Sequence, residues 1–231
     1  MQAVIMAAGE GTRMRPLTLK TPKGMLLIKG KPLLEWTLSF LPKEVDEVII
    51  IVNYLADQIK NYFGDEWQGR KIKYVVQEEL NGTGGAVQAC RDAIKGKFIV
   101  VNGDDLFYKK DLEKLCQEEL AILAFEVDDP SRFGVFKIDE RGNLIDIIER
   151  PKTKEFKLIN TGAYALNKNF FDYELVQITE KEFGLPQTVV KMTDRHEVKI
   201  IPAEYWFSVG NPDDLEKAQA EIEKFIAKVQ P

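Results

Sequence analysis

Residues 3–23 of this chain read AVIMAAGEGTRMRPLTLKTPK, a short apolar run followed by a long polar loop. The apolar run is typical of a strand that is buried on both faces. Ala8, Gly9 and Gly11 then remove side-chain bulk where the chain leaves the strand. Because glycine tolerates positive φ angles, such a loop can point several backbone N–H groups at one anionic group. We therefore predict a strand and a ligand-binding loop around which the rest of the chain is organised.

The same loop carries the cations Arg13, Arg15 and Lys23, which can neutralise phosphate oxygens. Two common phosphate-binding motifs do not fit the loop. The dinucleotide fingerprint has a third glycine where this chain has Met14, and no Gly-Lys-Ser/Thr run of a P-loop is present. What remains is Gly-Glu-Gly-Thr-Arg at residues 9–13, followed by a Pro-Lys pair that ends at Lys23.

The composition argues against several classes of protein. With a net charge of −5 and no basic run, the chain does not fit a nucleic-acid binder. Two isolated cysteines and one histidine give no support for a disulfide framework, a zinc site or a Ser/His or Cys/His catalytic group. The chain starts directly with a strand pattern, and no apolar run approaches transmembrane length. We expect a cytoplasmic protein without a signal peptide that binds neither nucleic acid nor membrane.

The first hundred residues alternate between strand and helix patterns. Near-continuous valine and isoleucine at 45–52 is typical of a strand inside a parallel sheet. The other expected elements here are strands at 71–77 and 97–102 and helices at 32–41, 54–63 and 83–94. This alternation predicts an α/β fold with a doubly wound, Rossmann-like, mixed but mostly parallel sheet flanked by helices.

The second half has a different pattern, in which short strands dominate. We expect antiparallel additions to the sheet at 120–127, 133–139, 144–149, 158–166 and 196–202. From Pro212 a last helix carries one apolar stripe, which can pack against the body or against a partner subunit, so a homo-oligomer stays open. No repeat or flexible linker divides the chain. We predict a single domain over residues 1–231, with residues 1–110 and 111–231 as its two halves.

Polar residues follow two of the predicted strands, where ligands of open α/β sheets bind. Gln77 ends one strand, and Gly82 and Thr83 lie in the turn after it. The amide of Gln77 offers a donor and an acceptor, which matches the edge of a uracil or thymine base. Asp104 follows the next strand. A carboxylate there, of Asp104 or of the adjacent Asp105, suits Mg²⁺, a hard cation that takes oxygen ligands and bridges substrate phosphates.

These motifs resemble those of the sugar-1-phosphate nucleotidyltransferases, also called nucleotide-sugar pyrophosphorylases. Their Gly-x-Gly-Thr-Arg loop and Pro-Lys pair are matched here by Gly9, Gly11, Thr12, Arg13 and Lys23. The resemblance extends over nearly the whole chain and implies the nucleotide-diphospho-sugar transferase type of fold. It implies that the first half binds the nucleotide through the loop together with Ala8, Gln77, Gly82 and Thr83, and that Asp104 holds Mg²⁺. Gln and Gly at the base are associated with UTP or dTTP.

The resemblance also implies a set of residues that binds the sugar phosphate in the second half. Gly134 resembles the glycine whose backbone approaches the sugar. Glu149 and Arg150 stand where the family has Glu-Lys, the glutamate contacting sugar hydroxyls and the lysine the phosphate; arginine can clamp phosphate as a planar fork. Asn160 and Gly162 resemble the family's Asn-x-Gly, which also faces the sugar.

One position departs from the family pattern. The family has Trp-x-Asp-x-Gly, whose aspartate completes the metal site, and this chain has Ser208 there. Serine is a weaker magnesium ligand than a carboxylate. Either water and nucleotide phosphates complete the metal shell around Asp104, or metal affinity is reduced.

The sequence thus predicts Mg²⁺-dependent transfer of a nucleotidyl group from a nucleoside triphosphate to a sugar 1-phosphate, with Arg13, Lys23 and Asp104 as the catalytic residues. Two alternatives stay open. One is a catalytically weak homologue that binds a nucleotide sugar and regulates a partner, and the other is a nucleotidyltransferase with a non-sugar phosphate acceptor. No acyltransferase-like repeat follows in this sequence, so we expect one activity.

Overall fold

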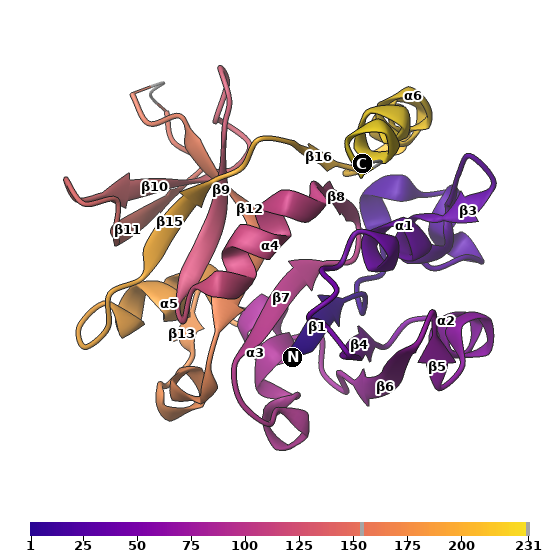
Figure 1. Cartoon of the computed structure of the whole chain (residues 1–231), viewed down its shortest axis with the longest axis horizontal. Coiled ribbons are helices and arrows are strands. Elements are labelled where there is room, and N and C mark those ends of the chain that lie inside the picture. The colour runs from indigo at the N-terminus through magenta and orange to yellow at the C-terminus, as the bar shows by residue number, and fades with distance from the viewer. Residues whose placement is uncertain (153–154, 230–231) are drawn as a thin grey trace.

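The computed structural model describes residues 1–152 and 155–229. Within them, ten strands form one sheet: β1 (Gln2–Met6), β4 (Glu47–Val52), β5 (Glu66–Trp67), β6 (Arg70–Val76), β7 (Phe98–Asn102), β9 (Ala121–Glu126), β10 (Gly134–Ile138), β11 (Leu144–Glu149), β12 (Leu158–Leu166) and β15 (Lys199–Pro202). The order is β11-β10-β12-β7-β1-β4-β6-β5, with β9 also paired to β12 and β15 to β9 (Figure 1).

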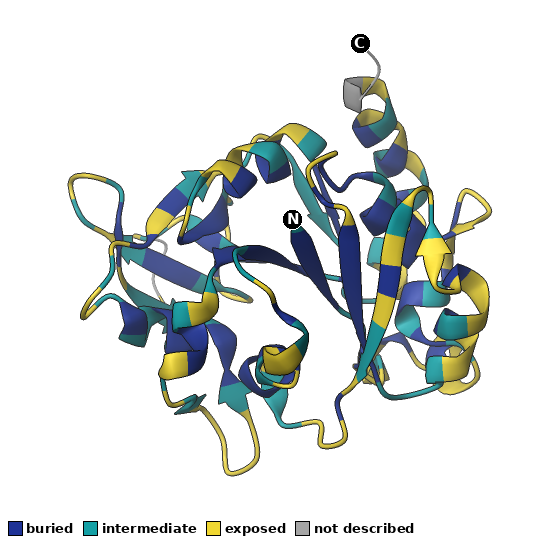
Figure 2. Ribbon diagram, turned by 60° about the horizontal axis from the view of Figure 1, so that its bottom comes forward, coloured by how far each residue is buried: buried dark blue, intermediate teal, exposed yellow. Residues whose placement is uncertain are grey.

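The centre of the sheet is parallel. Strand β1 pairs in parallel with both β4 and β7, and β4 pairs in parallel with β6. Alternate residues of β4 enter two different cores, with Ile49 and Ile51 on one face and Val48, Ile50 and Val52 on the other. Burial on both faces explains why this strand has no polar alternation in the sequence. Figure 2 shows the central strands buried.

Helices cover both faces of the sheet. Helices α1 (Leu33–Ser39), α2 (Ala56–Phe63) and α4 (Lys109–Gln117) pack their apolar sides on one face, and α3 (Gly82–Gln88) and α5 (Leu185–Met192) on the other. Each helix buries one stripe, such as Ile59 and Phe63 of α2. The predicted doubly wound, mixed but mostly parallel α/β fold is confirmed.

The second half adds mainly antiparallel strands, as expected. Strand β12 runs antiparallel to β7, β9 and β10, and β10 runs antiparallel to β11. The exception is β15, which pairs in parallel with β9. It also begins at Lys199 instead of His196, because the backbone N–H of His196 still donates to Met192 at the end of α5. The expected antiparallel direction was wrong for β15, because this strand runs parallel to β9.

The sequence predicted a helix at 83–94, and the structure divides this segment. Helix α3 ends at Gln88, and a 3₁₀ turn follows at Arg91–Ala93. Glycines at three of the first four positions of α3 weaken its helix propensity by roughly 1 kcal/mol each. The helices α4 and α5 and several short elements were not predicted. The latter are β2 (Leu27–Ile28), β3 (Lys31–Pro32), β8 (Asp105–Phe107), β13 (Val176–Gln177), β14 (Phe183–Gly184), β16 (Trp206–Ser208) and 3₁₀ turns at Thr12–Met14, Leu17–Leu19, Lys23–Met25 and Lys168–Asp172.

The last helix, α6 (Pro212–Val229), begins where the sequence predicted and packs beside α1 (Figure 1). Its buried residues Ala218, Ile222 and Phe225 enter a third apolar cluster that also contains Phe40 and Met14. The apolar stripe of the helix is thus covered by the body of the chain. It ties the C-terminal segment to the loop that follows β1.

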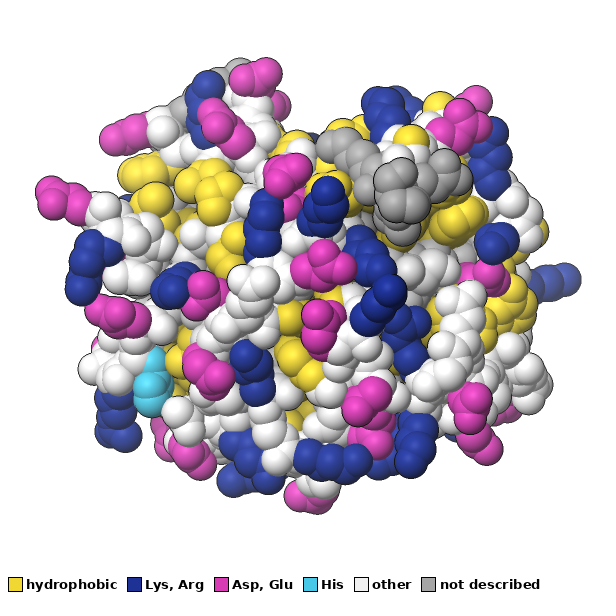
Figure 3. Space-filling model, viewed as in Figure 1, with side chains coloured by type: hydrophobic (Ala, Val, Ile, Leu, Met, Phe, Trp, Pro, Cys, Tyr) yellow, Lys and Arg dark blue, Asp and Glu magenta, His cyan; other side chains and the backbone are white. Residues whose placement is uncertain are grey.

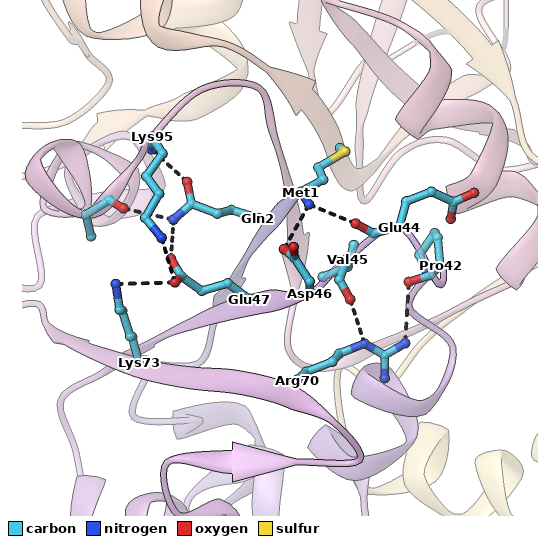
Figure 4. A network of polar contacts seen from close by, with 11 residues as sticks. Met1, Gln2, Pro42, Glu44, Val45, Asp46, Glu47, Arg70, Lys73 and Lys95 are labelled. Carbon is cyan, nitrogen blue, oxygen red and sulfur yellow. Dashed lines mark hydrogen bonds and ion pairs between the residues drawn. The ribbon is translucent and has the colours of Figure 1, made fainter.

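The amino ends of the parallel strands are fixed by a polar network (Figure 4). The buried carboxylate of Glu47 accepts from Gln2 and from Lys95 at 2.9 Å, and it pairs with Lys73 at 3.4 Å. The guanidinium of Arg70 donates to the carbonyl of Val45 at 3.0 Å. This network holds one edge of the sheet and leaves the carboxyl ends of the strands at the opposite edge.

On the face shown in Figure 3, acidic and basic side chains are interspersed. No helix within residues 1–152 and 155–229 combines the length and the apolar character that a membrane span requires.

Candidate active site

The loops that leave the parallel strands are joined to neighbouring strands at the carboxyl edge of the sheet. The backbone N–H of Ala7 donates to Ile51, and that of Gly103 donates to Met6, each at 3.0 Å. The backbone hydrogen bonds between neighbouring strands thus continue past the ends of the strands. Loops that are distant in sequence therefore start from fixed positions around one hollow.

A cavity of about 410 Å³ lies at this edge. Its lining contains every residue that the sequence predicted for nucleotide binding and catalysis: Ala8, Gly9, Gly11, Thr12, Arg13, Lys23, Gln77, Gly82, Thr83 and Asp104. These residues come from three separate loops, after β1, β6 and β7. The structure thus brings them together on one surface.

Gly11 fixes the shape of the first loop. Its φ is +62°, and its carbonyl accepts hydrogen bonds from the N–H of Met14 at 2.9 Å and from the hydroxyl of Thr18 at 2.8 Å. A Cβ at this position would lie 3.0 Å from Thr18 Cγ2 and 3.1 Å from Lys23 Cβ. Both the backbone angle and the space therefore require glycine here.

The side chain of Met14 anchors the loop to the body of the chain. It is fully buried in the third apolar cluster, together with Val209 and Ile222. This is the position where a dinucleotide fingerprint would have a glycine. A large apolar residue within a polar loop is the one sequence signal of this anchor. The anchor holds the cationic part of the loop against the body of the chain.

Lys23 and Asp104 form an ion pair in the cavity. The Nζ atom of Lys23 donates a hydrogen bond to Oδ2 of Asp104. The side chain of Lys23 is 12% exposed and that of Asp104 is 35% exposed. The carboxylate can therefore reach ligands in the cavity, while the lysine is held mostly inside the protein. The two charges neutralise each other in the protein without substrate.

The neighbouring Asp105 has a different role from Asp104, because it does not line the cavity. It is buried, its Oδ2 accepts from the amide of Asn102 at 2.9 Å, and its Oδ1 accepts from no residue that the structure describes. Burial, and next the charge of Asp104, raise the pKa of Asp105 to about 7. Ser208 lies directly opposite Asp105 in the β8–β16 pair. A neutral residue at 208 thus avoids a third carboxylate beside two others.

Arg13 extends the positive charge of the loop along the cavity. It is exposed and forms no ion pair with any residue in the described part of the chain. Its Nη1 atom would lie 3.9 Å from a Cβ placed on Gly210, just beyond β16. The guanidinium therefore has free donors for an anionic ligand.

Gln77 is buried, and its amide is already engaged. Its Nε2 donates to Oδ1 of Asn81 and to the carbonyl of Gly82, each at 3.1 Å. The two donor hydrogens are thus used to hold the turn before α3. The donor that the sequence analysis assigned to a base is occupied in this structure, and Oε1 is left as the acceptor.

The five residues predicted to bind the sugar phosphate do not line this cavity. Gly134 and Glu149 lie opposite each other in the β10–β11 pair, and Arg150 follows as an exposed residue with φ +47°. Asn160 accepts from the N–H of Gly162 at 2.9 Å.

The residues predicted to bind the sugar phosphate approach the cavity lining at Gly162. A Cβ on Gly162 would lie 2.0 Å from Nδ2 of Asn102, and Asn102 lines the cavity. Gly162 on β12 thus lies beside Asn102 at the end of β7, the strand that precedes Asp104.

Residues 2–224 match the sequence family described as Nucleotidyl transferase. The chain belongs to this family. It is 37% identical over 221 residues to the bifunctional protein GlmU of Methanocaldococcus jannaschii. The matched region covers 94% of this chain and 53% of that protein. The chain thus spans about half the length of the GlmU relatives that it matches.

Two further proteins match this chain over nearly their whole length. The chain is 36% identical to D-glycero-alpha-D-manno-heptose 1-phosphate guanylyltransferase of Campylobacter jejuni, covering 93% of this chain and 96% of that one. The structure of HddC from Yersinia pseudotuberculosis complexed with GMP-PN has 30% identity and a TM-score of 0.72, covering 96% and 99% of the two chains.

Several residues of the cavity were not predicted from the sequence. Asn102 and Gly210 lie within two of the motifs but were assigned no role there. Glu182 and the exposed Leu80 carry no motif at all. Glu182 comes from the segment between β13 and β14, about a hundred residues after α3, so only the tertiary structure brings it to the cavity.

Proposed function

We propose that this chain transfers a nucleotidyl group from a nucleoside triphosphate to a sugar 1-phosphate and releases pyrophosphate. One observation carries the proposal: a single cavity joins the Gly11 loop, the cations Arg13 and Lys23, and the carboxylate of Asp104. The family to which the chain belongs supports the same chemistry.

In the proposed reaction an oxygen of the sugar phosphate attacks the α-phosphorus of the triphosphate. A bond forms between them, and the bond from the α-phosphorus to the oxygen bridging to the β-phosphorus breaks, so that pyrophosphate leaves with its electrons. The attacking oxygen is already ionised near neutral pH, so no protein base is needed. This agrees with a described cavity lining that contains no histidine.

Catalysis then consists of alignment and neutralisation of charge. Arg13 would hold the leaving pyrophosphate, Lys23 the α-phosphate and Arg150 the incoming phosphate. N–H groups of the loop at Gly9, Gly11 and Thr12 would bind phosphate oxygens. Each charged contact of this kind supplies roughly 2–4 kcal/mol of transition-state stabilisation.

We further propose Mg²⁺ as the metal. No group of three His, Cys, Asp or Glu residues within the described parts of the chain is arranged to hold a metal by itself. Asp104 offers one hard oxygen ligand at the cavity, which fits a cation that takes its other ligands from water and substrate phosphates. When bound, the ion would neutralise charge on the phosphates. Asp104 would anchor it, and Lys23 would then be free to bind phosphate.

For the base we propose a pyrimidine, UTP or dTTP, because Oε1 of Gln77 can accept the N3–H of uracil or thymine. Guanine is the second candidate, because its N1–H presents the same donor to that oxygen. The relative named as a guanylyltransferase and the neighbour complexed with GMP-PN favour this second candidate. With its donor occupied, the remaining acceptor of Gln77 does not distinguish a pyrimidine from guanine.

For the acceptor we propose that Glu149, Asn160 and the backbone at Gly134 and Gly162 contact sugar hydroxyls. The alternatives remain a non-sugar phosphate acceptor and a homologue that binds a nucleotide sugar with little turnover.

A grid of five nucleoside triphosphates against several sugar 1-phosphates and non-sugar phosphates, with Mg²⁺, tests the proposal by pyrophosphate release. We expect turnover with a uridine, thymidine or guanosine triphosphate and a sugar 1-phosphate, and loss of turnover in Asp104→Asn. Release with a non-sugar phosphate alone would change the acceptor class. Tight binding of a nucleotide sugar with no release from any pair would contradict the proposed reaction.

A further inference from the structure

Residues 182–187 connect the two predicted groups of ligand-binding residues. The N–H of Phe183 donates to the carbonyl of Asn81 at 2.8 Å, and the N–H of Leu185 donates to Oγ1 of Thr83 at 3.0 Å. Asn81 ends the turn that follows Gln77, and Thr83 lies in the first turn of α3. Four residues after Phe183, Gln187 contacts Glu149 on β11. One short segment is thus bonded to the base side of the cavity and reaches the predicted sugar side.

The contact between Gln187 and Glu149 has a defined geometry. Nε2 of Gln187 donates to Oε1 of Glu149 at 2.8 Å. Oε1 of Gln187 is buried and accepts from no residue in the described chain. This oxygen lies against Gly184, where a Cβ would come within 1.8 Å of it. The opposite orientation of the amide would turn its oxygen toward the carboxylate, so the charge of Glu149 fixes the orientation.

The backbone at Gly134 also lies close to the carboxylate of Glu149. A Cβ on Gly134 would lie 3.1 Å from Oε1 of Glu149. Burial, and in smaller part the charge of Glu149, raise the pKa of Tyr164, whose hydroxyl accepts from Asn160 at 2.7 Å. Glu149 therefore lies beside Gly134, another residue of the predicted sugar group, and among the described residues Gln187 holds its carboxylate by a hydrogen bond.

Gln187 is itself held firmly. It lies in the first turn of α5, where the hydroxyl of Thr188 donates to the carbonyl of Gly184 at 2.7 Å and accepts from the N–H of Val176 at 3.0 Å. A buried carbonyl without a partner is unfavourable, so the orientation of this amide needs a compensating role. Holding the carboxylate of Glu149 supplies one.

We propose that Gln187 is a positioning residue, which orients the carboxylate of Glu149 to accept hydrogen bonds from the hydroxyl groups of a sugar 1-phosphate. The inference rests on the proposed function and deepens it. Because residues 183 and 185 are bonded to the turn at the base side, the carboxylate is placed at a fixed distance from the nucleotide. Selectivity among sugar 1-phosphates that differ at one hydroxyl then depends on Gln187 although it does not touch the sugar.

The test compares Gln187→Met, which keeps the volume and removes the donor, with Gln187→Glu, which places a second negative charge beside Glu149. In both variants, measured with the substrate pair that the wild type uses best, we expect the KM for the sugar 1-phosphate to be roughly tenfold higher than in the wild type. The KM for the triphosphate should stay within about twofold. The rates with two sugar 1-phosphates that differ at one hydroxyl should become more alike. Gln177→Met is the matched control, because Gln177 is exposed on β13 and donates only to the local carbonyl of Glu180 at 3.1 Å among described residues.

Two further measurements separate positioning from a structural role. The double variant Glu149→Gln/Gln187→Met should be no worse than Glu149→Gln alone, because Gln187 acts through Glu149. Calorimetric binding of the nucleotide-sugar product should weaken in parallel with the rise in KM. If Gln187→Met fails to fold, as judged by its thermal midpoint, Gln187→Glu carries the comparison, alone and combined with Glu149→Gln.

Additive losses in the double variant, equal rises in both KM values, or unchanged sugar selectivity would overturn the inference while the proposed function stands. A wild type that forms no product from any pair would overturn the proposed function, and the inference with it.

Discussion

The side-chain ammonium of Lys23 donates a hydrogen bond to the carboxylate of Asp104, which lies 81 residues away in the sequence. The pair joins the end of the glycine loop to the turn after β7 across the cavity. In the protein without substrate, each charge satisfies the other. In the proposed reaction a triphosphate with its metal would offer a new partner to both, so binding would exchange one ion pair for two contacts with the ligand.

Lys23→Met and Asp104→Asn should each lower kcat/KM by roughly 10²–10³-fold, because each removes a charge that faces the reacting phosphates. Pyrophosphate release at saturating and limiting triphosphate measures the effect. Asp104→Asn should also raise the metal concentration that gives half the maximal rate.

Lys20→Met is the control for loss of a cation, since Lys20 is exposed and lies three residues before Lys23. Its rate should stay within about twofold of the wild type. Rates in Lys23→Met and Asp104→Asn that match those of Lys20→Met would contradict the assigned roles.

Gly11→Ala should raise the KM for the triphosphate and lower stability by about 1–2 kcal/mol, because alanine at φ +62° is strained and its Cβ meets Thr18 and Lys23. Substrate kinetics and urea denaturation measure the two effects. Gly96→Ala is the control, since a Cβ there has no neighbour within 4 Å. A Gly11→Ala protein with wild-type kinetics would show that the loop tolerates a different shape.

Most residues of the cavity could be predicted from the sequence, because they follow strands of the parallel sheet. Gly11, Gln77 and Asp104 each come a few residues after an apolar run that could be recognised alone. The carboxyl ends of parallel strands meet at one edge, so these residues had to come together.

The parts that could not be predicted depend on contacts between distant segments. Gln187 belongs to a helix that α3 and β11 cover, and no motif marks it. The occupied amide of Gln77 is a second case. The residue type suggested a donor and an acceptor for a base, but the turn at Asn81 uses the donor. Local sequence states which groups a side chain has, whereas the tertiary structure decides which of them remain available.

Ser208→Asp should strengthen metal binding and weaken the fold in the absence of metal. The new carboxylate would face Asp105 across the β8–β16 pair, beside a buried acid whose pKa is already raised to about 7 by burial and by the charge of Asp104. We expect a lower thermal midpoint in chelator, corresponding to about 1–2 kcal/mol. In Mg²⁺ the half-saturating metal concentration should fall several-fold. Ser208→Asn, which adds no charge, should show neither effect; equal behaviour of the two variants would contradict a metal near residue 208.

Glu47→Gln tests the network at the other edge of the sheet. Burial raises the pKa of Glu47, but hydrogen bonds from Lys95, Gln2 and Lys73 outweigh it and lower the pKa below its ordinary value. Because the pKa of Glu47 is lower in the folded state, the unfolded chain takes up the proton at a higher pH than the folded chain does. The stabilisation is therefore complete above about pH 4.5 and is lost as the pH falls through the folded-state pKa.

Glu47→Gln should thus lower the free energy of unfolding at pH 7 by about 1–2 kcal/mol and flatten its dependence on pH below that range. Urea denaturation between pH 3 and pH 7 measures both effects. Glu119→Gln is the control, because Glu119 is 73% exposed in its pair with Lys97. An unaltered acid limb in Glu47→Gln would show that this carboxylate does not set the acid stability.

The most direct test of the account is a crystal structure with a non-hydrolysable nucleoside triphosphate and Mn²⁺, whose anomalous signal locates the metal. The account predicts phosphate oxygens against the backbone of Gly11 and the side chain of Lys23, with the metal peak on the carboxylate of Asp104 and the Lys23–Asp104 pair separated. A triphosphate bound elsewhere on the chain, or a metal peak away from Asp104, would contradict it.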